Sequence, residues 1–129
     1  MALTNYLENK LLDHAIGKTA FAIPTVYIAL FKTAPDDTGA GSECAYTGYA
    51  RQAVGGNFAA ASGGSSANSA DFTFGLKTAG TDDTVGWWAT FDANAAGNML
   101  EYGTFDASKL ISNGDNPKIL SGQLTRTAD

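Results

Sequence analysis

Few side chains in the sequence are of types that catalyse reactions, and they form no catalytic pattern. The single histidine, His14, lies in a helical stretch beside Asp13, and one histidine cannot supply a two-histidine metal motif. The single cysteine, Cys44, can form neither a disulfide nor a cysteine metal cluster within one chain. Nucleophile elbows and phosphate-binding loops are absent from the sequence. We therefore interpret His14 as a surface or subunit-contact residue and predict that the protein is not an enzyme.

Two pairs of adjacent carboxylates are the remaining candidates for acid–base chemistry. Asp36–Asp37 and Asp82–Asp83 offer the two carboxyl groups that glycoside hydrolysis requires, but each pair lies in a loop rich in Gly and Thr. Adjacent aspartates in such loops usually serve turn geometry. Residues 92–98 and 113–116 have some features of calcium loops, yet neither segment has the required number and spacing of oxygen donors. The sequence predicts no catalytic residue, no metal and no cofactor.

Trp87 and Trp88 are the most prominent aromatic residues, and with nearby Phe and Tyr side chains they could form a sugar-binding platform. Because adjacent side chains on a strand face opposite ways, at most one of the two indoles belongs to the core. The other needs a second covering, which could be the N-terminal helix, a neighbouring subunit or a ligand. Gly86 and Thr90 supply few of the polar groups that sugar sites use, so we favour the helix or a subunit.

The first twenty residues, "MALTNYLENKLLDHAIGKTA", contain the one long segment with a helical period. We predict a helix over about residues 4–16, with Thr4 or Asn5 as its N-cap and Gly17 at its end. Its apolar side chains are candidate packing or assembly residues: Leu7, Leu11, Leu12 and Ile16. They either cover a sheet face or one end of the fold, or they dock on a neighbour, either a sister subunit or another protein.

From about residue 25 onward the sequence alternates between short strands and turns. "TVYIALFK" is apolar on both faces, which is typical of a covered central strand. "VGWWATFD" and "NMLEYGTF" are joined by "ANAAG" and predict a hairpin. Shorter strands are expected at 49–54, 57–61 and 71–76, and a loop at 62–70. The pattern predicts one mainly β domain over residues 1–129, an antiparallel β-sandwich or jelly-roll-like fold with one N-terminal helix.

Composition excludes several classes of partner. The net charge is −5 and the Lys and Arg residues are scattered, so we expect no nucleic-acid binding. No apolar run is long enough for a membrane span, and we expect no membrane interaction. Only 16% of the residues are charged, so small and weakly polar side chains cover much of the surface. Such a surface is suited to packing against other protein, and we expect a homo-oligomer.

Five stretches, taken in order, resemble a family of small virion proteins of tailed bacteriophages, described as tail fibre-like and similar to capsid decoration (cement) proteins. They are "MALTNYLENKLLDHAIGKTAF", "PTVYIALFKTAPDD", "GYARQAV", "FDANAAGNMLEYG" and "LISNGDNPKILSGQL". The resemblance covers nearly the whole chain. It implies a β-sandwich without an active site that assembles on the phage particle, commonly as a trimer.

Two roles follow from this resemblance. We favour a capsid decoration (cement) protein that binds the major capsid protein on the outside of the head and stabilises the shell, after synthesis in the host cytoplasm. The alternative is a tail or tail-fibre component that contacts the host surface. We expect a receptor-binding fibre to have a long loop or a fibrous repeat, and this chain has neither a sequence period nor a shaft. A soluble enzyme or sugar-binding module is a third class.

Overall fold

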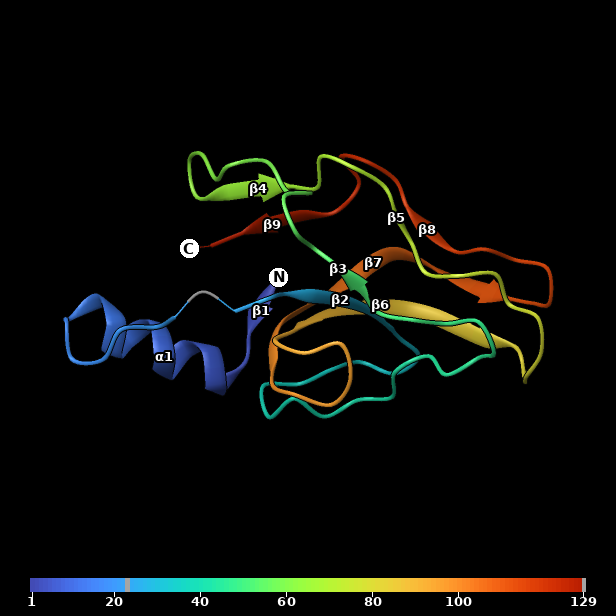
Figure 1. The fold of residues 1–129 in the computed structure, drawn as a ribbon, viewed down its shortest axis with the longest axis horizontal. Coiled ribbons are helices and arrows are strands. Elements are labelled where there is room, and N and C mark those ends of the chain that lie inside the picture. The colour runs from blue at the N-terminus through green and yellow to red at the C-terminus, as the bar shows by residue number, and fades with distance from the viewer. Residues whose placement is uncertain (23, 129) are drawn as a thin grey trace.

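The computed structural model describes residues 1–22 and 24–128, which form a mainly β fold with one helix at the N-terminal end (Figure 1). The helix α1 spans Asn5–Ala15. Across the described residues the strands are β1 (Ala2–Leu3), β2 (Tyr27–Phe31), β3 (Gln52–Ala53), β4 (Ser65–Ala67), β5 (Phe72–Thr73), β6 (Asp83–Phe91), β7 (Met99–Ile111), β8 (Lys118–Ile119) and β9 (Thr125–Thr127). The helix and the mainly β, antiparallel character agree with the sequence prediction.

The central element is a five-stranded antiparallel sheet with the order β1-β7-β6-β2-β3. Its longest pairing is the β6–β7 hairpin, which confirms the hairpin predicted from "ANAAG". In that connection Ala96 and Gly97 have φ values of 52° and 75°, which allow the chain to reverse. As predicted, β2 is a central strand, since it pairs with β6 on one side and β3 on the other.

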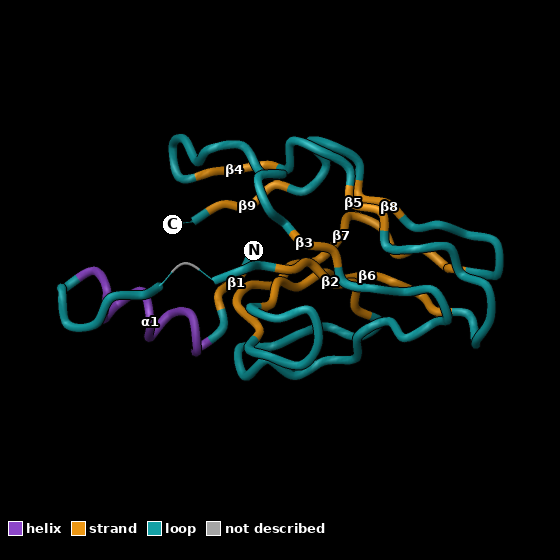
Figure 2. The backbone as a smooth tube through the Cα atoms, viewed as in Figure 1, coloured by secondary structure: helices purple, strands orange, loops and turns teal. Residues whose placement is uncertain are grey.

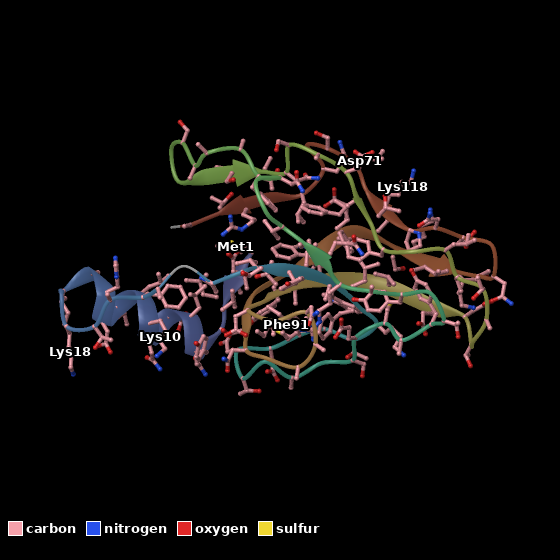
Figure 3. All side chains as sticks on the ribbon, in the orientation of Figure 1. Met1, Lys10, Lys18, Asp71, Phe91 and Lys118 are labelled. Atoms are coloured by element: carbon pink, nitrogen blue, oxygen red, sulfur yellow. The ribbon has the colours of Figure 1, made fainter. Side chains whose placement is uncertain are left out.

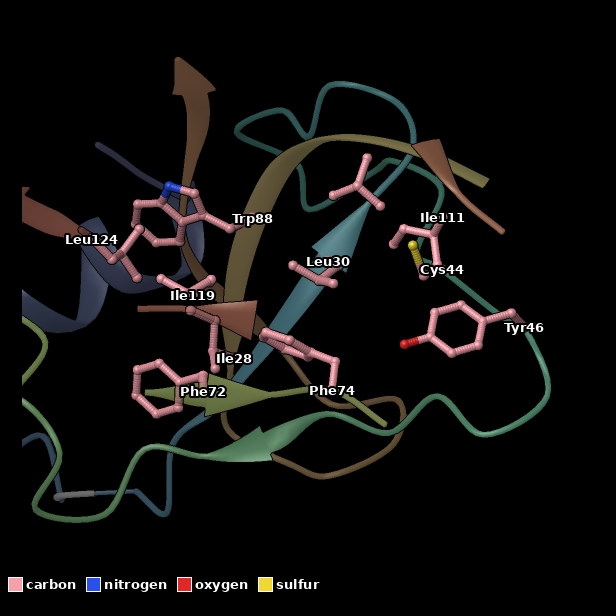
Figure 4. Close-up of a cluster of buried hydrophobic side chains, with 11 residues drawn as sticks. Ile28, Leu30, Cys44, Tyr46, Phe72, Phe74, Trp88, Ile111, Ile119 and Leu124 are labelled. Atoms are coloured by element: carbon pink, nitrogen blue, oxygen red, sulfur yellow. The ribbon is translucent and has the colours of Figure 1, made fainter. Parts of the chain in front are cut away.

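One face of this sheet is covered by two small ribbons, β4–β9 and β5–β8, which pair segments from the middle and the end of the chain (Figure 2). Between the layers lies the main core, shown in Figure 4. Its buried members are Ile28, Leu30, Cys44, Tyr46, Phe72, Phe74, Val85, Trp88, Ile111, Ile119 and Leu124. This two-layer arrangement is a β-sandwich-like fold, while the jelly-roll connectivity stays a prediction.

The opposite face of the sheet carries a second, smaller cluster, formed by Ala29, Phe31, Ala89, Phe91 and Met99. The rings of Phe31 and Phe91 stack with centroids 6.0 Å apart. The Arg51 guanidinium lies 3.7 Å from the Phe91 ring centroid. Arg51 also pairs with Glu43 through Nε and Nη2, and its Nη1 donates to two carbonyl oxygens of the 92–98 connection. Loops rather than strands therefore cover this face.

Several predicted boundaries are wrong. The Ser- and Gly-rich segment 62–70, predicted to be a loop, contains β4, because its backbone pairs with β9 about sixty positions later in the chain. The strand predicted at 49–54 is reduced to β3, and 57–61 contributes a single bridge between Phe58 and Asn68. Strands also do not begin at residue 25, since β1 precedes the helix and pairs with Tyr102 and Glu101. Two of these differences, β1 and β4, arise from pairings between distant parts of the chain.

Candidate functional site

The N-terminal arm, residues 5–22, extends away from the sheet at one end of the molecule (Figure 1). Thr4 is the N-cap of α1, because its Oγ1 accepts a hydrogen bond from the Leu7 N–H at 3.4 Å. The same hydroxyl lies 2.6 Å from the Met99 carbonyl oxygen, to which it donates. The Asn5 N–H donates to the Asp37 carbonyl at 2.9 Å. The arm is thus attached at its first turn, and of the two N-caps considered, Thr4 is the one used.

Most of the apolar stripe on the arm is exposed. Leu7, nearest the sheet, is 7% exposed. Leu11 is 39% exposed, and Leu12 and Ile16 are 67% and 76% exposed. The structure therefore divides the four predicted packing or assembly residues into one buried anchor and three side chains that this chain does not cover.

The arm has internal structure beyond the helix. Gly17 ends the helix with a φ of 72°, and the Lys18 N–H donates to the Asp13 carbonyl at 2.9 Å. The chain then turns back, and the Phe21 N–H donates to Nδ1 of His14 at 3.0 Å. His14 therefore fastens the returning segment to the helix, while Lys10 and Lys18 lie on the part of the arm that extends from the sheet (Figure 3).

The two tryptophans face opposite sides of β6, as predicted. Trp88 is 3% exposed in the main core, and its ring lies so close to Gly103 that a Cβ there would be 2.6 Å from it. Trp87 is part-buried and packs against the smaller cluster. The second covering expected for Trp87, by the helix, a subunit or a ligand, stays a prediction. Other members of the smaller cluster are covered by the loop that contains Gly39 and Gly41. Cβ atoms built on Gly41 and Gly39 would lie 3.0 Å from Phe31 and 3.5 Å from Met99.

A groove of about 580 Å³ lies along the seam between β7 and the connection from β8 to β9. Its floor is apolar and includes Leu30, Val85, Trp88, Ile111, Ile119 and Leu124. Its walls carry Asp106, Lys109, Lys118 and Gln123, together with Leu120, which is 54% exposed. The sequence did not reveal this groove, since its lining comes from segments between Leu30 and Thr125 and has no local pattern. We call it the seam groove.

The aspartate pairs have structural roles that separate the two carboxylates of each pair. Asp36 accepts hydrogen bonds from the Thr38 hydroxyl, the Ala40 N–H and the Thr38 N–H, and the first of these contributes most to lowering its pKa. Its neighbour Asp37 instead accepts from the Tyr102 hydroxyl on β7. Tyr102 keeps its proton more strongly as a result, and this bond is the main reason that its pKa rises to about 12. The pair does not converge on a shared site.

In the second pair, Asp82 and Asp83 each bind a different lysine, and the lysine bound by Asp82 is buried. Nζ of Lys77 donates to the carbonyl oxygen of Gly80 at 2.9 Å and to Asp82 Oδ1 and Asn113 Oδ1, each at 3.0 Å. These three bonds use all the hydrogens of an ammonium group whose side chain is fully buried. The bond from Lys77 and a second from Ser112 lower the pKa of Asp82. Asp83 pairs with Lys32 instead, at 3.4 Å. The lysine thus fastens two loops together.

A further ion pair joins the layers. Glu101, buried on β7, accepts two hydrogen bonds from Arg126 on β9, one of them 2.7 Å from Nε to Oε2. Arg126 also lies over the Phe58 ring, 5.3 Å from its centroid. Sequence reasoning missed this pair and the buried Lys77. A charged residue between apolar neighbours, such as the Glu in "NMLEYGTF", was the available signal.

The described residues were also considered as a possible metal site and as a possible membrane span. No three His, Cys, Asp or Glu residues among residues 1–22 and 24–128 are grouped to hold a metal ion. Asp92, in one of the segments with calcium-loop features, accepts from the Asn98 N–H at 2.7 Å and from Nδ2 of Asn98 at 2.9 Å, which closes the turn. Within the same residues, α1 falls short of the length and apolar character that membrane crossing needs.

Comparison with known proteins gives one match over nearly all of this structure. The model of the family described as Podophage GP4 fiber I protein gp80 matches residues 2–127. The chain belongs to this family. No curated protein matches the chain. The match extends from β1 to β9 and therefore includes the arm, the sheet and the seam groove. The protein is a structural protein of the phage virion, of the fibre-like kind that its sequence resembles.

Proposed function

We propose that this gp80-family protein is a non-enzymatic assembly subunit of the phage fibre and that the arm is its main contact with other virion proteins. The observation that carries this proposal is the exposure of Leu11, Leu12 and Ile16 on a helix that leaves the sheet. Exposed apolar side chains gathered on one element are typical of protein–protein interfaces. The described carboxylates that could do chemistry are held in turns and ion pairs, which supports a structural role.

The fibre location is supported by the family description, which names a fibre protein of a podophage. The head decoration role has support of a different kind. The longest strand in residues 1–22 and 24–128 has 13 residues and the sequence has no repeat, so this described part of one copy contains no shaft of its own. Decoration of the capsid surface through contacts with the major capsid protein, as a trimer, is therefore the second candidate.

Copy number on purified particles distinguishes the two locations. A small protein bound at repeated points of the icosahedral shell is present in hundreds of copies, whereas a fibre protein is confined to the tail and is present in far fewer. We expect quantitative gel densitometry, with the major capsid protein as internal reference, to give the low number. Abundance close to that of the capsid protein, with earlier rupture on heating of particles that lack this protein, would favour the decoration role.

A second measurement tests the arm itself. Particles assembled with the Leu12→Asp/Ile16→Asp variant should lack the protein, because two carboxylates would enter an apolar contact without partners. Leu76→Asp is the matched control, since Leu76 is 50% exposed and lies outside both the arm and the seam groove. Wild-type incorporation of the arm variant would contradict the proposal that the arm makes the contact.

A further inference from the structure

We infer that the arm of one copy docks in the seam groove of a second copy, so that the subunits join head to tail. This inference rests on the proposed function, in which the chain is an assembly subunit, and it names both surfaces of the contact. An amphipathic helix laid in an apolar groove is a common mode of protein recognition, read through anchors at i, i+3, i+4 and i+7. Leu12 and Ile16 have the i, i+4 spacing, with Leu11 beside them.

The seam groove has the character that such a helix requires. Its floor presents core side chains, among them Leu30, Val85 and Ile111, so a docking helix would extend the core that already exists. Leu120, on the wall, is itself half exposed and would be covered by the same contact. The groove and the arm are thus two incompletely covered apolar surfaces of one chain.

The charges of the two surfaces are complementary. Within the described part of the chain, the four salt bridges use Lys32, Arg51, Lys77 and Arg126. Outside the arm, the cations that make none of these bridges are Lys109 and Lys118, and both line the seam groove. The arm carries Glu8 and Asp13, which also make none of the four bridges. The contact we infer places Glu8 and Asp13 of the arm against Lys109 and Lys118, with Lys10 and Lys18 of the arm facing Asp106 of the groove wall or solvent.

Net charge also favours a contact between the arm of one copy and the body of another over a contact between two bodies. The arm contains two acidic residues, Glu8 and Asp13, and two basic ones, Lys10 and Lys18, so its formal charge is zero. The remaining residues then carry the whole formal charge of −5. Two bodies would repel each other, whereas a neutral arm approaches an acidic body without that cost.

Two other ways of covering the arm within copies of this chain fit the structure less well. The arm does not lie in the seam groove of its own chain: its first turn is bonded to Met99 and Asp37, which lie outside the groove, and the helix extends away from the sheet (Figure 1). A bundle of arms from several copies would be a coiled coil of 11-residue helices, less than two heptads long, with Leu7 already packed against the body. Coiled coils of that length are not stable. Among contacts between copies of this chain, docking in a second copy's seam groove therefore fits best, and binding to a different virion protein is an outcome of the test below.

A contact of this kind is heterologous, because each copy contributes an arm and a groove to different neighbours. Heterologous contacts close into a ring when the rotation between copies allows it, and otherwise continue as an open filament. Both outcomes suit a fibre or virion protein, and a closed ring of three would be the trimer that the sequence resemblance implies.

Mixing two defective variants tests the inference. The arm variant is Leu12→Asp/Ile16→Asp, and the groove variant is Lys109→Glu/Leu120→Asp, in which exposed residues are changed so that folding is retained. We expect sedimentation to show association of the wild type, with each variant alone weakened by about a hundredfold or more. An equimolar mixture should form a complex of one copy of each, because the intact arm of one variant fits the intact groove of the other.

The inference is overturned by three results. A wild type that stays monomeric at its highest soluble concentration means that the arm binds another protein, a result that leaves the proposed virion role intact if particles still contain the protein. Variants that associate like the wild type exclude these surfaces. Variants that are monomeric alone and do not combine when mixed point to contacts between like surfaces. Leu76→Asp again serves as the matched control and should associate normally.

A cross-link gives an independent readout. Ile16→Cys in one copy and Gln123→Cys in another should form a disulfide-linked pair on mild oxidation, because both positions lie in the inferred contact. The native Cys44 is buried, and burial raises the pKa of its thiol to about 12, so it does not compete. Ile16→Cys mixed with Leu76→Cys is the control and should give no specific pair.

Discussion

The arm and the sheet solve the same problem, the covering of apolar side chains, in opposite ways. In the sheet, both faces of β2 and β6 are buried, one by the ribbons β4–β9 and β5–β8 and the other by loops. In the arm, Leu7 alone of the stripe is buried, and the rest of the helix carries exposed Leu and Ile. One copy thus buries most of the apolar surface of its sheet, except along the seam groove, whereas it leaves most of the arm's apolar stripe without cover.

Buried charges show the same contrast. Three such charges lie in the body. Lys77 joins two loops through three hydrogen bonds, Glu101 accepts two from Arg126 on β9, and Arg51 donates four to Glu43 and the 92–98 connection. Among the described residues, no buried side-chain nitrogen or oxygen lacks a partner. The salt bridges of the described residues do not include the arm. Substitutions should therefore affect folding in the body and association in the arm, with effects that can be ranked.

The largest loss of stability is expected from Lys77→Ala. The variant leaves a cavity in place of a long buried stem and removes three hydrogen bonds from the Gly80, Asp82 and Asn113 oxygens. We expect a loss of about 3 kcal/mol or more in the free energy of unfolding, measured by urea denaturation. Lys77→Met retains most of the volume and should lose clearly less. Because Lys77→Met also removes the three hydrogen bonds, its own loss measures their contribution, and a Lys77→Met variant as stable as the wild type would contradict the hydrogen-bonding role.

A smaller loss, about 2 kcal/mol, is expected from Arg126→Met, which leaves the buried carboxylate of Glu101 without its ion-pair partner. The double variant Glu101→Met/Arg126→Met removes both charges and should be more stable than Arg126→Met alone. Urea unfolding of the two single variants and the double variant forms a cycle that measures the coupling. Additive losses would show that the pair does not join β9 to the sheet.

Alkaline pH should lower the free energy of unfolding of the body. Burial is the main cause of the raised pKa values of Tyr46, about 12, and of Tyr49, whereas the bond to Asp37 is the main cause for Tyr102, also about 12. A tyrosine in the unfolded chain titrates near 10, so this stabilisation is complete below about pH 10 and is lost as pH rises toward 12. Urea midpoints at stepped pH should fall over that window.

The variant Tyr46→Phe is the control for the alkaline effect. It removes a phenol whose pKa is raised, together with the hydrogen bond that this phenol donates to the Gly75 carbonyl. The free energy of unfolding at neutral pH should therefore fall by about 1 kcal/mol. Its stability should then decline less steeply between about pH 10 and 12 than that of the wild type. An unchanged slope would mean that Tyr46 does not contribute.

The smallest effect on stability is expected in the arm. Leu12→Asp changes a side chain that is 67% exposed, and the free energy of unfolding of one copy should change by less than about 0.5 kcal/mol. Leu7→Asp, on the same helix, places a carboxylate in a buried position and should cost several times as much. Circular dichroism during urea unfolding measures both, at a concentration where the protein is monomeric. A large loss from Leu12→Asp would place the arm in the core.

The predictable parts of the fold are those with a local pattern. The period of Leu7, Leu11 and Leu12 predicts the helix, the two-sided apolar run predicts β2, and the turn residues 93–97 predict the β6–β7 hairpin. Where a strand is two or three residues long, no period can develop, and Ser65 pairs with Thr127 through a contact that no local sequence specifies. The apolar stripe of the arm was found from the sequence, but the seam groove required the sheet and both ribbons to be in place.

The attachment of the arm has a mechanical consequence. Force applied to a docked arm enters the body by two routes, through Thr4 and the short β1 ladder to β7, and along the covalent chain to β2. These two strands flank β6 on either side, so the load is divided across the middle of the sheet. Under tension the two-residue β1 ladder, with its few hydrogen bonds, would yield first. The arm would then lengthen as a tether, and the long β6–β7 hairpin would stay folded while the particle is pulled.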